Sequence, residues 1–140
     1  MAFLHPLLLQ YYITEQCNCR CHVCDIWRKG ATDDAALAVV VKRLHEAQRI
    51  GVGFVDFTGG EPLLHPQLPD MLRAAQACGL KTTLTTNTLL YPLRCKELVG
   101  LVDFLHFSLD GAEAEVHNRL RGARVFDHVL SSLDLARSCG

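Results

Sequence analysis

Apolar and polar positions along the chain follow a pattern that repeats four times: a short apolar or β-branched run, a polar loop, and a segment with helical spacing. Each run is seven or eight residues long and is followed by glycine or a polar residue. Such runs are typical of β-strands. We therefore predict strands at residues 7–14, 52–58, 80–86 and 103–109.

The segments that follow the strands place apolar residues three or four positions apart, which indicates amphipathic helices. The first helix is expected to begin at a capping Thr32 or Asp33, to reach Ile50 and to stop at Gly51. The last is expected to stop at Gly140. The predicted helices cover residues 32–50, 68–78, 92–101 and 126–138.

Strands that alternate with helices imply crossover connections and a parallel sheet, so the predicted fold class is α/β. In such a sheet, the loops that follow the strands leave from the same edge. The unusual polar residues of this chain fall in those loops, and we expect them to form one site. They are the cysteine cluster after the first strand, Gly59, Gly60, Glu61 and Pro62 after the second, Asn87 after the third, and Ser108 and Asp110 after the fourth.

The composition indicates one globular unit, residues 1–140, in which 49% of the residues are hydrophobic. The 14 Lys and Arg residues nearly balance the 15 Asp and Glu residues and are scattered along the chain. We therefore expect no nucleic-acid partner and no anionic membrane surface as a partner. The apolar N-terminal run lacks a basic region and a cleavage site, and Gln10 interrupts it short of a membrane span. A cytoplasmic protein is the expectation.

Four of the seven cysteines fall within eight residues, at positions 17, 19, 21 and 24. In a chain without an export signal, this spacing is more typical of a metal site than of disulfides. Cys78, Cys95 and Cys139 lie in helical patterns and are expected to be small buried hydrophobes.

Two motifs carry a family resemblance. Cys17, Cys21 and Cys24 form CxxxCxxC within ITEQCNCRCHVCDIW, and residues 59–62 form GGEP within DFTGGEPLLHP. In this order, at the ends of the first two predicted strands, the motifs resemble the signatures of the radical SAM superfamily. TTN after the third strand and SLDG after the fourth extend the resemblance from about residue 8 to the C-terminus. HNRLRG at 117–122 is similar to members that modify peptides or build cofactors.

The resemblance implies that Cys17, Cys21 and Cys24, the three predicted ligand cysteines, bind a [4Fe-4S] cluster. A cubane cluster normally takes four thiolates. Three would leave one iron open to S-adenosylmethionine (SAM), as a catalytic zinc site keeps one position open. Reductive cleavage of SAM would then give a 5′-deoxyadenosyl radical that abstracts hydrogen from an unknown substrate, a peptide or a small molecule. An electron donor such as flavodoxin or ferredoxin is also implied.

By the same resemblance, the cofactor-binding residues around SAM would be Gly59, Gly60, Glu61, Pro62, Asn87, Ser108 and Asp110. The two glycines would let the backbone approach SAM, and Glu61 would orient the loop or accept a hydrogen bond from the SAM amino group. Ser108 and Asp110 would provide polar contacts to the ribose. Arg121 would either meet the SAM carboxylate or be exposed.

Simpler interpretations of the same residues remain open. The glycine pair could form an ordinary turn before Pro62, Asn87 could only end a strand, and Ser108 and Asp110 could be turn formers. Cys19 could be a fourth ligand, which would close the open iron. The whole cluster could instead be a structural zinc module, although no second ligand pair follows. A third possible function, besides a radical SAM enzyme and a zinc module, is an iron-sulfur protein that binds SAM without turnover.

The resemblance implies a core of six βα units, of which the chain supplies about four. The predicted architecture is thus a partial (β/α) TIM-like barrel, the N-terminal part of a radical SAM core. We expect a fragment, a truncated gene product, or a core that another polypeptide completes. Because parallel sheets are normally covered on both faces, an exposed apolar inner face and an unpaired strand edge are expected.

Overall fold

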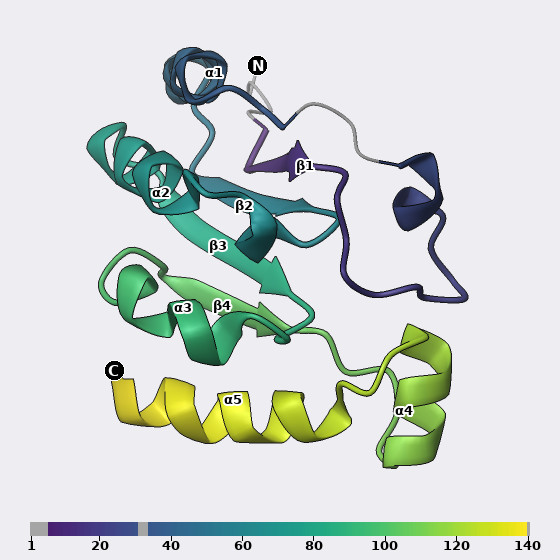
Figure 1. Cartoon of the computed structure of the whole chain (residues 1–140). Helices are drawn as coiled ribbons and strands as arrows, with labels where there is room; N and C mark the ends of the chain where they lie inside the picture. The colour runs from purple at the N-terminus through teal and green to yellow at the C-terminus, as the bar shows by residue number, and fades with distance from the viewer. Residues whose placement is uncertain (1–5, 31–33, 140) are drawn as a thin grey trace.

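The computed structural model describes residues 6–30 and 34–139. Four parallel strands form one sheet, and their order in the sheet is their order in the chain (Figure 1). They are β1 (Leu8–Thr14), β2 (Phe54–Gly59), β3 (Lys81–Thr86) and β4 (Phe104–Phe107). The predicted α/β class and the partial-barrel arrangement of four parallel βα units are confirmed.

The described part of the chain also contains five α-helices and two short 3-10 helices, of which α4 and α5 follow the last strand. The α-helices are α1 (Leu37–Arg49), α2 (Leu68–Ala77), α3 (Tyr91–Leu98), α4 (Ala114–Arg121) and α5 (Phe126–Cys139), and the 3-10 helices are η1 (Ile26–Lys29) and η2 (Pro62–Leu64). In Figure 1, α1 lies toward the β1 end of the sheet and α5 toward the β4 end. Within these elements no helix is long and apolar enough to cross a membrane.

The core lies between the helices and one face of the sheet. Successive strand residues point to opposite faces, and those on the helix side, such as Val55, Phe57 and Leu84, are fully buried. They pack with apolar residues of α1 and α2, including Leu44 and Met71. The hydrophobic periodicity of the sequence therefore places the core correctly.

The other face of the sheet is only in part the exposed apolar surface that the sequence predicts. Its lower part, where the strands begin, carries Leu8 and Phe104, both about half exposed. Toward the carboxyl ends of the strands the face becomes polar, because Asp56 accepts hydrogen bonds from the hydroxyls of Thr83 (2.7 Å) and Thr85 (3.2 Å). Because successive residues of β3 point to opposite faces, the hydroxyls of Thr83 and Thr85 both lie on this face. The sequence shows that β3 is rich in Thr but does not show which face these hydroxyls occupy.

Most predicted bounds differ from the structure by one or two residues, and the larger differences are in the first and third helices and in the fourth strand. The first helix begins at Leu37, because Ala35 donates its backbone N–H to Ile13 of β1 (2.9 Å) and so extends the chain before the helix. Thr32, Asp33 and Gly140 lie outside the described residues. The third helix covers Tyr91–Leu98 rather than residues 92–101, and β4 ends at Phe107.

Helix α4 is missing from the sequence prediction. It is short and mostly polar, so hydrophobic periodicity does not reveal it. Its end does carry a recognisable signal: Arg119 and Arg121 lie in the last turn, and Gly122 follows in the left-handed conformation with φ 61°.

Candidate active site at the carboxyl ends of the strands

A cavity of about 190 Å³ opens at the carboxyl ends of the four strands, and we call it the site cavity. It is bounded by the cysteine loop, residues 15–25, and by the ends of β2, β3 and β4. The polar residues predicted from separate loops therefore come together. Those that line it are Cys17, Cys21, Cys24, Gly59, Gly60, Asn87, Ser108 and Asp110, whereas Glu61 and Pro62 lie behind its wall.

The three predicted ligand cysteines differ in exposure: Cys21 is buried, Cys17 is partly buried and Cys24 is exposed. Within the described residues, no three His, Cys, Asp or Glu side chains converge closely enough to bind a single metal ion. A cubane cluster does not require such convergence, because each of its thiolate ligands binds a different iron. The three predicted ligands line one cavity and are therefore a donor set that fits a cluster. Cys19 lines the same cavity, and the ligand assignment itself stays a prediction.

Cys19 is the most deeply buried of the four clustered cysteines. It is 1% exposed and packs against Val125, with Leu89 and Ala123 at the edge of the same apolar cluster. Burial raises the pKa of the Cys19 thiol to about 12, so it is neutral at physiological pH. Burial also raises the pKa of Cys17, a predicted ligand, and Cys19 lines the site cavity too, so the exclusion of Cys19 from the ligand set stays a prediction.

The end of α4 borders the cysteine loop. The backbone N–H of Arg20 donates to Arg121 O (3.1 Å), and that of His22 donates to Leu120 O (2.9 Å). The Arg121 guanidinium lies 3.8 Å from Cys21 Sγ. Its Nε lies 2.6 Å from Asp110 Oδ2, an ion pair in which the N–H is not aligned for a hydrogen bond. Arg121 is therefore one of the site residues, and its side chain is only 16% exposed.

The two glycines of the GGEP loop are required by the backbone of the cysteine loop. A Cβ at Gly60 would overlap the carbonyl of Gln16, and one at Gly59, where φ is 129°, would overlap that of Thr14. Hydrogen bonds from Gly60 N to Thr14 O (2.8 Å) and from Glu61 N to Gln16 O (2.7 Å) maintain this close approach. The observed reason for glycine is thus contact between two loops, and contact with SAM stays a prediction.

Glu61 orients the GGEP loop, which is one of the two roles expected for it. Its carboxylate is fully buried and accepts hydrogen bonds from Leu63 N (3.0 Å), Thr86 Oγ1 (2.7 Å) and Asn87 N (2.8 Å). Burial raises its pKa, and these donors partly offset the rise. Pro62, also buried, is the first residue of η2. The Glu61 side chain has no surface on the site cavity that could meet a SAM amino group.

Asn87 connects the end of β3 to the cysteine loop. Its Nδ2 donates to Asn18 Oδ1 (2.7 Å) and lies 4.0 Å from Cys17 Sγ, while its Oδ1 accepts from Leu89 N (3.1 Å). Asn87 therefore does more than end a strand. It fixes the loop beside one predicted ligand cysteine.

The end of β4 is held by a histidine that the sequence prediction omits. Asp110 N donates to His117 Nδ1 (3.1 Å), and the imidazole is fully buried in the described structure. Burial and the nearby Arg121 charge lower the pKa of His117, so the ring is neutral. Ser108 N donates to Thr86 O (3.0 Å), which brings Ser108 to the wall of the site cavity.

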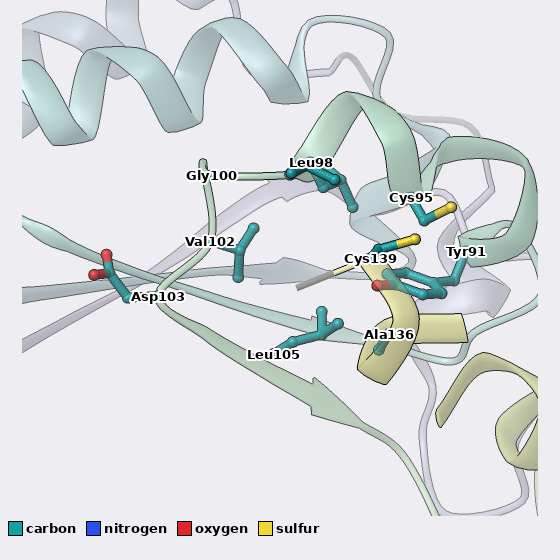
Figure 2. A pocket seen from close by; sticks show the side chains of 10 residues that line it. Tyr91, Cys95, Leu98, Gly100, Val102, Asp103, Leu105, Ala136 and Cys139 are labelled. Carbon is teal, nitrogen blue, oxygen red and sulfur yellow. The ribbon is translucent and has the colours of Figure 1, made fainter. Parts of the chain in front are cut away.

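A second cavity, of about 230 Å³, lies between α3, β4 and α5 (Figure 2). Figure 2 shows the Cys95 and Cys139 side chains near each other beside Tyr91, with Leu105 and Ala136 below them. As expected, Cys95 is buried, whereas Cys139 is only partly so. The carboxylate in its wall, Asp103, is bound to Lys81 (2.6 Å) and to Thr82. This cavity offers little free polar chemistry, so the site cavity remains the candidate.

Comparison with known families agrees with the cysteine-lined cavity. Residues 11–140 match the Radical SAM superfamily. The chain belongs to the radical SAM superfamily. Members use a [4Fe-4S] cluster and SAM, which corresponds to the donor set and the neighbouring GGEP loop described above.

Two curated radical SAM relatives show how much of a complete protein the chain represents. It is 35% identical over 127 residues to a GTP 3′,8-cyclase of Chlorobaculum tepidum, which covers 87% of this chain and 38% of the relative. It is 31% identical over 141 residues to an AdoMet-dependent heme synthase of Methanosarcina barkeri, which covers 94% of this chain and 39% of the relative. The chain therefore spans about two fifths of these relatives.

The radical SAM fold is also evident from solved structures. The crystal structure of Streptococcus suis SuiB bound to S-adenosylmethionine superposes with a TM-score of 0.85 at 24% sequence identity. The match covers 97% of this chain and 32% of SuiB. At this identity the comparison establishes the partial-barrel fold.

Proposed function

We propose that this chain is the N-terminal part of a radical SAM core domain in an enzyme that cleaves SAM reductively. The supporting observation is that the three predicted ligand cysteines line one cavity with the GGEP glycines and the ends of β3 and β4. When bound, the [4Fe-4S] cluster would supply the electron that converts SAM to methionine and a 5′-deoxyadenosyl radical, which abstracts hydrogen from a substrate. The rest of the barrel would come from additional sequence.

The residues around the proposed cluster position the cysteine loop and set its electrostatics. Arg121 places a positive charge 3.8 Å from Cys21 Sγ. Asn87 holds Asn18, and Gly60 allows the GGEP loop to pack directly on the cysteine loop. A hydrogen bond or a positive charge near a cluster sulfur would raise the reduction potential of the cluster. These contacts would therefore affect how readily the cluster accepts an electron.

The cofactor would occupy the side of the site cavity that Gly59, Gly60, Ser108 and Asp110 line. Backbone groups of the glycines would approach its methionine end, and the polar residues after β4 its ribose. Because Asp110 already pairs with Arg121, we assign the greater share of ribose contacts to Ser108.

The proposed substrate is polar, either a peptide segment or a small molecule. It would enter along the open face of the sheet, where Asp56, Thr83 and Thr85 lie below the site cavity. The relatives act on chemically different molecules, so their names do not narrow the class further. We also propose a cytoplasmic location and an external protein electron donor.

The proposed function is tested by anaerobic reconstitution of the complete gene product with iron and sulfide. We expect about four iron and four sulfide per chain, and SAM-dependent production of 5′-deoxyadenosine with dithionite as the reductant. Replacing any ligand cysteine with Ala should abolish both. Zinc in place of iron would support the structural module instead, and a cluster without 5′-deoxyadenosine would support the non-catalytic SAM-binding protein.

A further inference from the structure

A pair of cysteines outside the site cavity comes together between two helices. Cys95 lies within α3, and Cys139 is the last residue of α5. Both line the second cavity, which shares no lining residue with the site cavity. Figure 2 shows their side chains near each other, and a side-chain hydrogen bond joins the two thiols. The fold therefore pairs two thiols that the sequence places in separate helical patterns.

The two thiols differ in their access to solvent. Cys95 is 4% exposed, and burial, together with the neighbouring Cys139 thiol, raises its pKa. Cys139 is partly exposed at the end of its helix. A small oxidant would therefore meet Cys139 first, while Cys95 lies behind it as a shielded second thiol.

The second cavity gives these side chains room to move. Two bonded sulfur atoms lie about 2.05 Å apart, closer than two thiols joined by a hydrogen bond, so at least one side chain must shift before a bond can form. In a close-packed core such a shift would displace neighbouring atoms. Here an open volume of about 230 Å³ adjoins both thiols. The Tyr91 ring packs edge-on against Phe107 (centroids 4.9 Å apart) and holds α3 on the sheet while the side chains change rotamer.

We propose that Cys95 and Cys139 are a redox-sensitive dithiol that forms a reversible disulfide between α3 and α5. The oxidant is a low-molecular-weight disulfide of the glutathione class. The Cys139 thiolate attacks one sulfur of that disulfide, which forms a mixed disulfide and releases one thiolate. The Cys95 thiolate then attacks the Cys139 sulfur and releases the second thiolate. Two protein thiols are thus oxidised, one small disulfide is reduced to two thiols, and the two protons pass from the protein thiols to the released thiolates.

The disulfide would link two helices that both begin beside the cysteine loop. Leu89, just before α3, and Val125, just before α5, pack together with Cys19 of that loop. A covalent bond between the helices restricts the unfolded chain, so the oxidised protein should resist unfolding more than the reduced protein. This inference is independent of the proposed radical SAM function, because neither thiol lines the site cavity.

The test exposes the complete, cluster-loaded protein to oxidised glutathione under anaerobic conditions. The remaining thiols are blocked with N-ethylmaleimide, and the cysteine-containing peptides are mapped by mass spectrometry. We expect one pair of peptides joined through Cys95 and Cys139, and we expect added reduced glutathione to separate them. The urea midpoint of unfolding should be higher after oxidation than before it.

Three single substitutions separate this bond from other thiol chemistry. Cys95→Ala and Cys139→Ala should each lose the linked peptides and the rise in the urea midpoint. If Cys95→Ala does not fold, Cys139→Ala removes the same bond at a partly exposed position. Cys78→Ala is the matched control, because Cys78 is also buried but lies against His45 (3.5 Å) instead of a second thiol. It should behave as the unaltered protein does.

Several results would overturn the dithiol proposal. They are a Cys139 that stays joined to glutathione, a link from either cysteine to a different cysteine, no modification at either position, and a bond that reduced glutathione does not open. An equal rise in the urea midpoint in Cys139→Ala would overturn it as well. The peptide map identifies the linked residues with or without a cluster, so absence of a cluster would refute the proposed function alone.

Discussion

The buried carboxylate of Glu61 gives the sharpest test of how this site is built. Its Oε1 accepts from Leu63 N and Thr86 Oγ1, and its Oε2 accepts from Asn87 N. All three partners are donors. Glu61→Gln replaces one acceptor oxygen with an NH₂ group, so at least one donor must face another donor in a fully buried position.

The expected cost of Glu61→Gln follows from that mismatch. With the amide oxygen at the Oε1 position, two hydrogen bonds survive and the N–H of Asn87 loses its acceptor. A buried donor without a partner costs about 1–3 kcal/mol. Burial of the charged carboxylate is itself unfavourable, which is why the pKa of Glu61 is raised, so the neutral amide recovers a part of this cost. We expect the free energy of unfolding to fall by about 1–3 kcal/mol.

Urea unfolding of the cluster-free protein, followed by circular dichroism, measures this change. Glu46→Gln is the matched control, because Glu46 lies on the surface of α1 and pairs only with exposed Arg43 among its described contacts. It should change stability by no more than about 0.5 kcal/mol. A Glu61→Gln protein as stable as the control would refute the assigned hydrogen-bond directions. Because Asn87 also holds Asn18, the variant should bind less iron after reconstitution as well.

Three further predictions concern the same loops. Cys19→Ala should retain the iron-sulfur absorbance while Ala at any predicted ligand cysteine removes it, and the reverse result would show that the ligand set is wrong. Gly60→Ala should lower both iron content and stability, because the added Cβ overlaps the Gln16 carbonyl. Gly53→Ala is the control, because its Cβ would meet only ordinary contacts. Equal iron content in the two variants would contradict the packing of the GGEP loop on the cysteine loop. The pKa of His117 is lowered in the folded state, so only the unfolded state binds a proton at this ring as the pH falls below about 6.5. The free energy of unfolding, measured by urea titration, should therefore decline below that pH, and it should decline less in His117→Asn. Identical pH profiles for the two proteins would argue against a buried neutral imidazole.

Much of the fold can be predicted from hydrophobic periodicity, because the spacing of apolar residues along a strand or helix also decides which of them are buried. Leu44 in α1 and Met71 in α2 each belong to a set of apolar residues at helical spacing, and both are core residues. Apolar or β-branched runs predict all four strands. Helix α4 escapes this approach because it buries little besides His117. Its position depends on tertiary contacts with the cysteine loop, which local sequence does not encode.

The sequence predicts which residues come together at the site better than it predicts what each of them does there. Parallel topology alone brings residues from four loops to one rim, which places the cysteines, Gly60 and Ser108 in one cavity. The roles of Glu61 and Asn87 depend on which atoms lie opposite their side chains. Arg121 is ambiguous in sequence for the same reason, since its burial results from Asp110 and Cys21 on other segments.

The bridge between the cysteine loop and the end of α4 has a consequence for biosynthesis. The loop occurs early in the chain, yet the groups that hold Arg20 and His22 belong to residues synthesised about a hundred positions later. At roughly 5–20 residues per second, the ribosome would need on the order of 5–20 s to supply them. During that interval a nascent chain has its thiols but lacks the segment that fixes their loop. We therefore expect iron-sulfur assembly to occur only after α4 has left the ribosome.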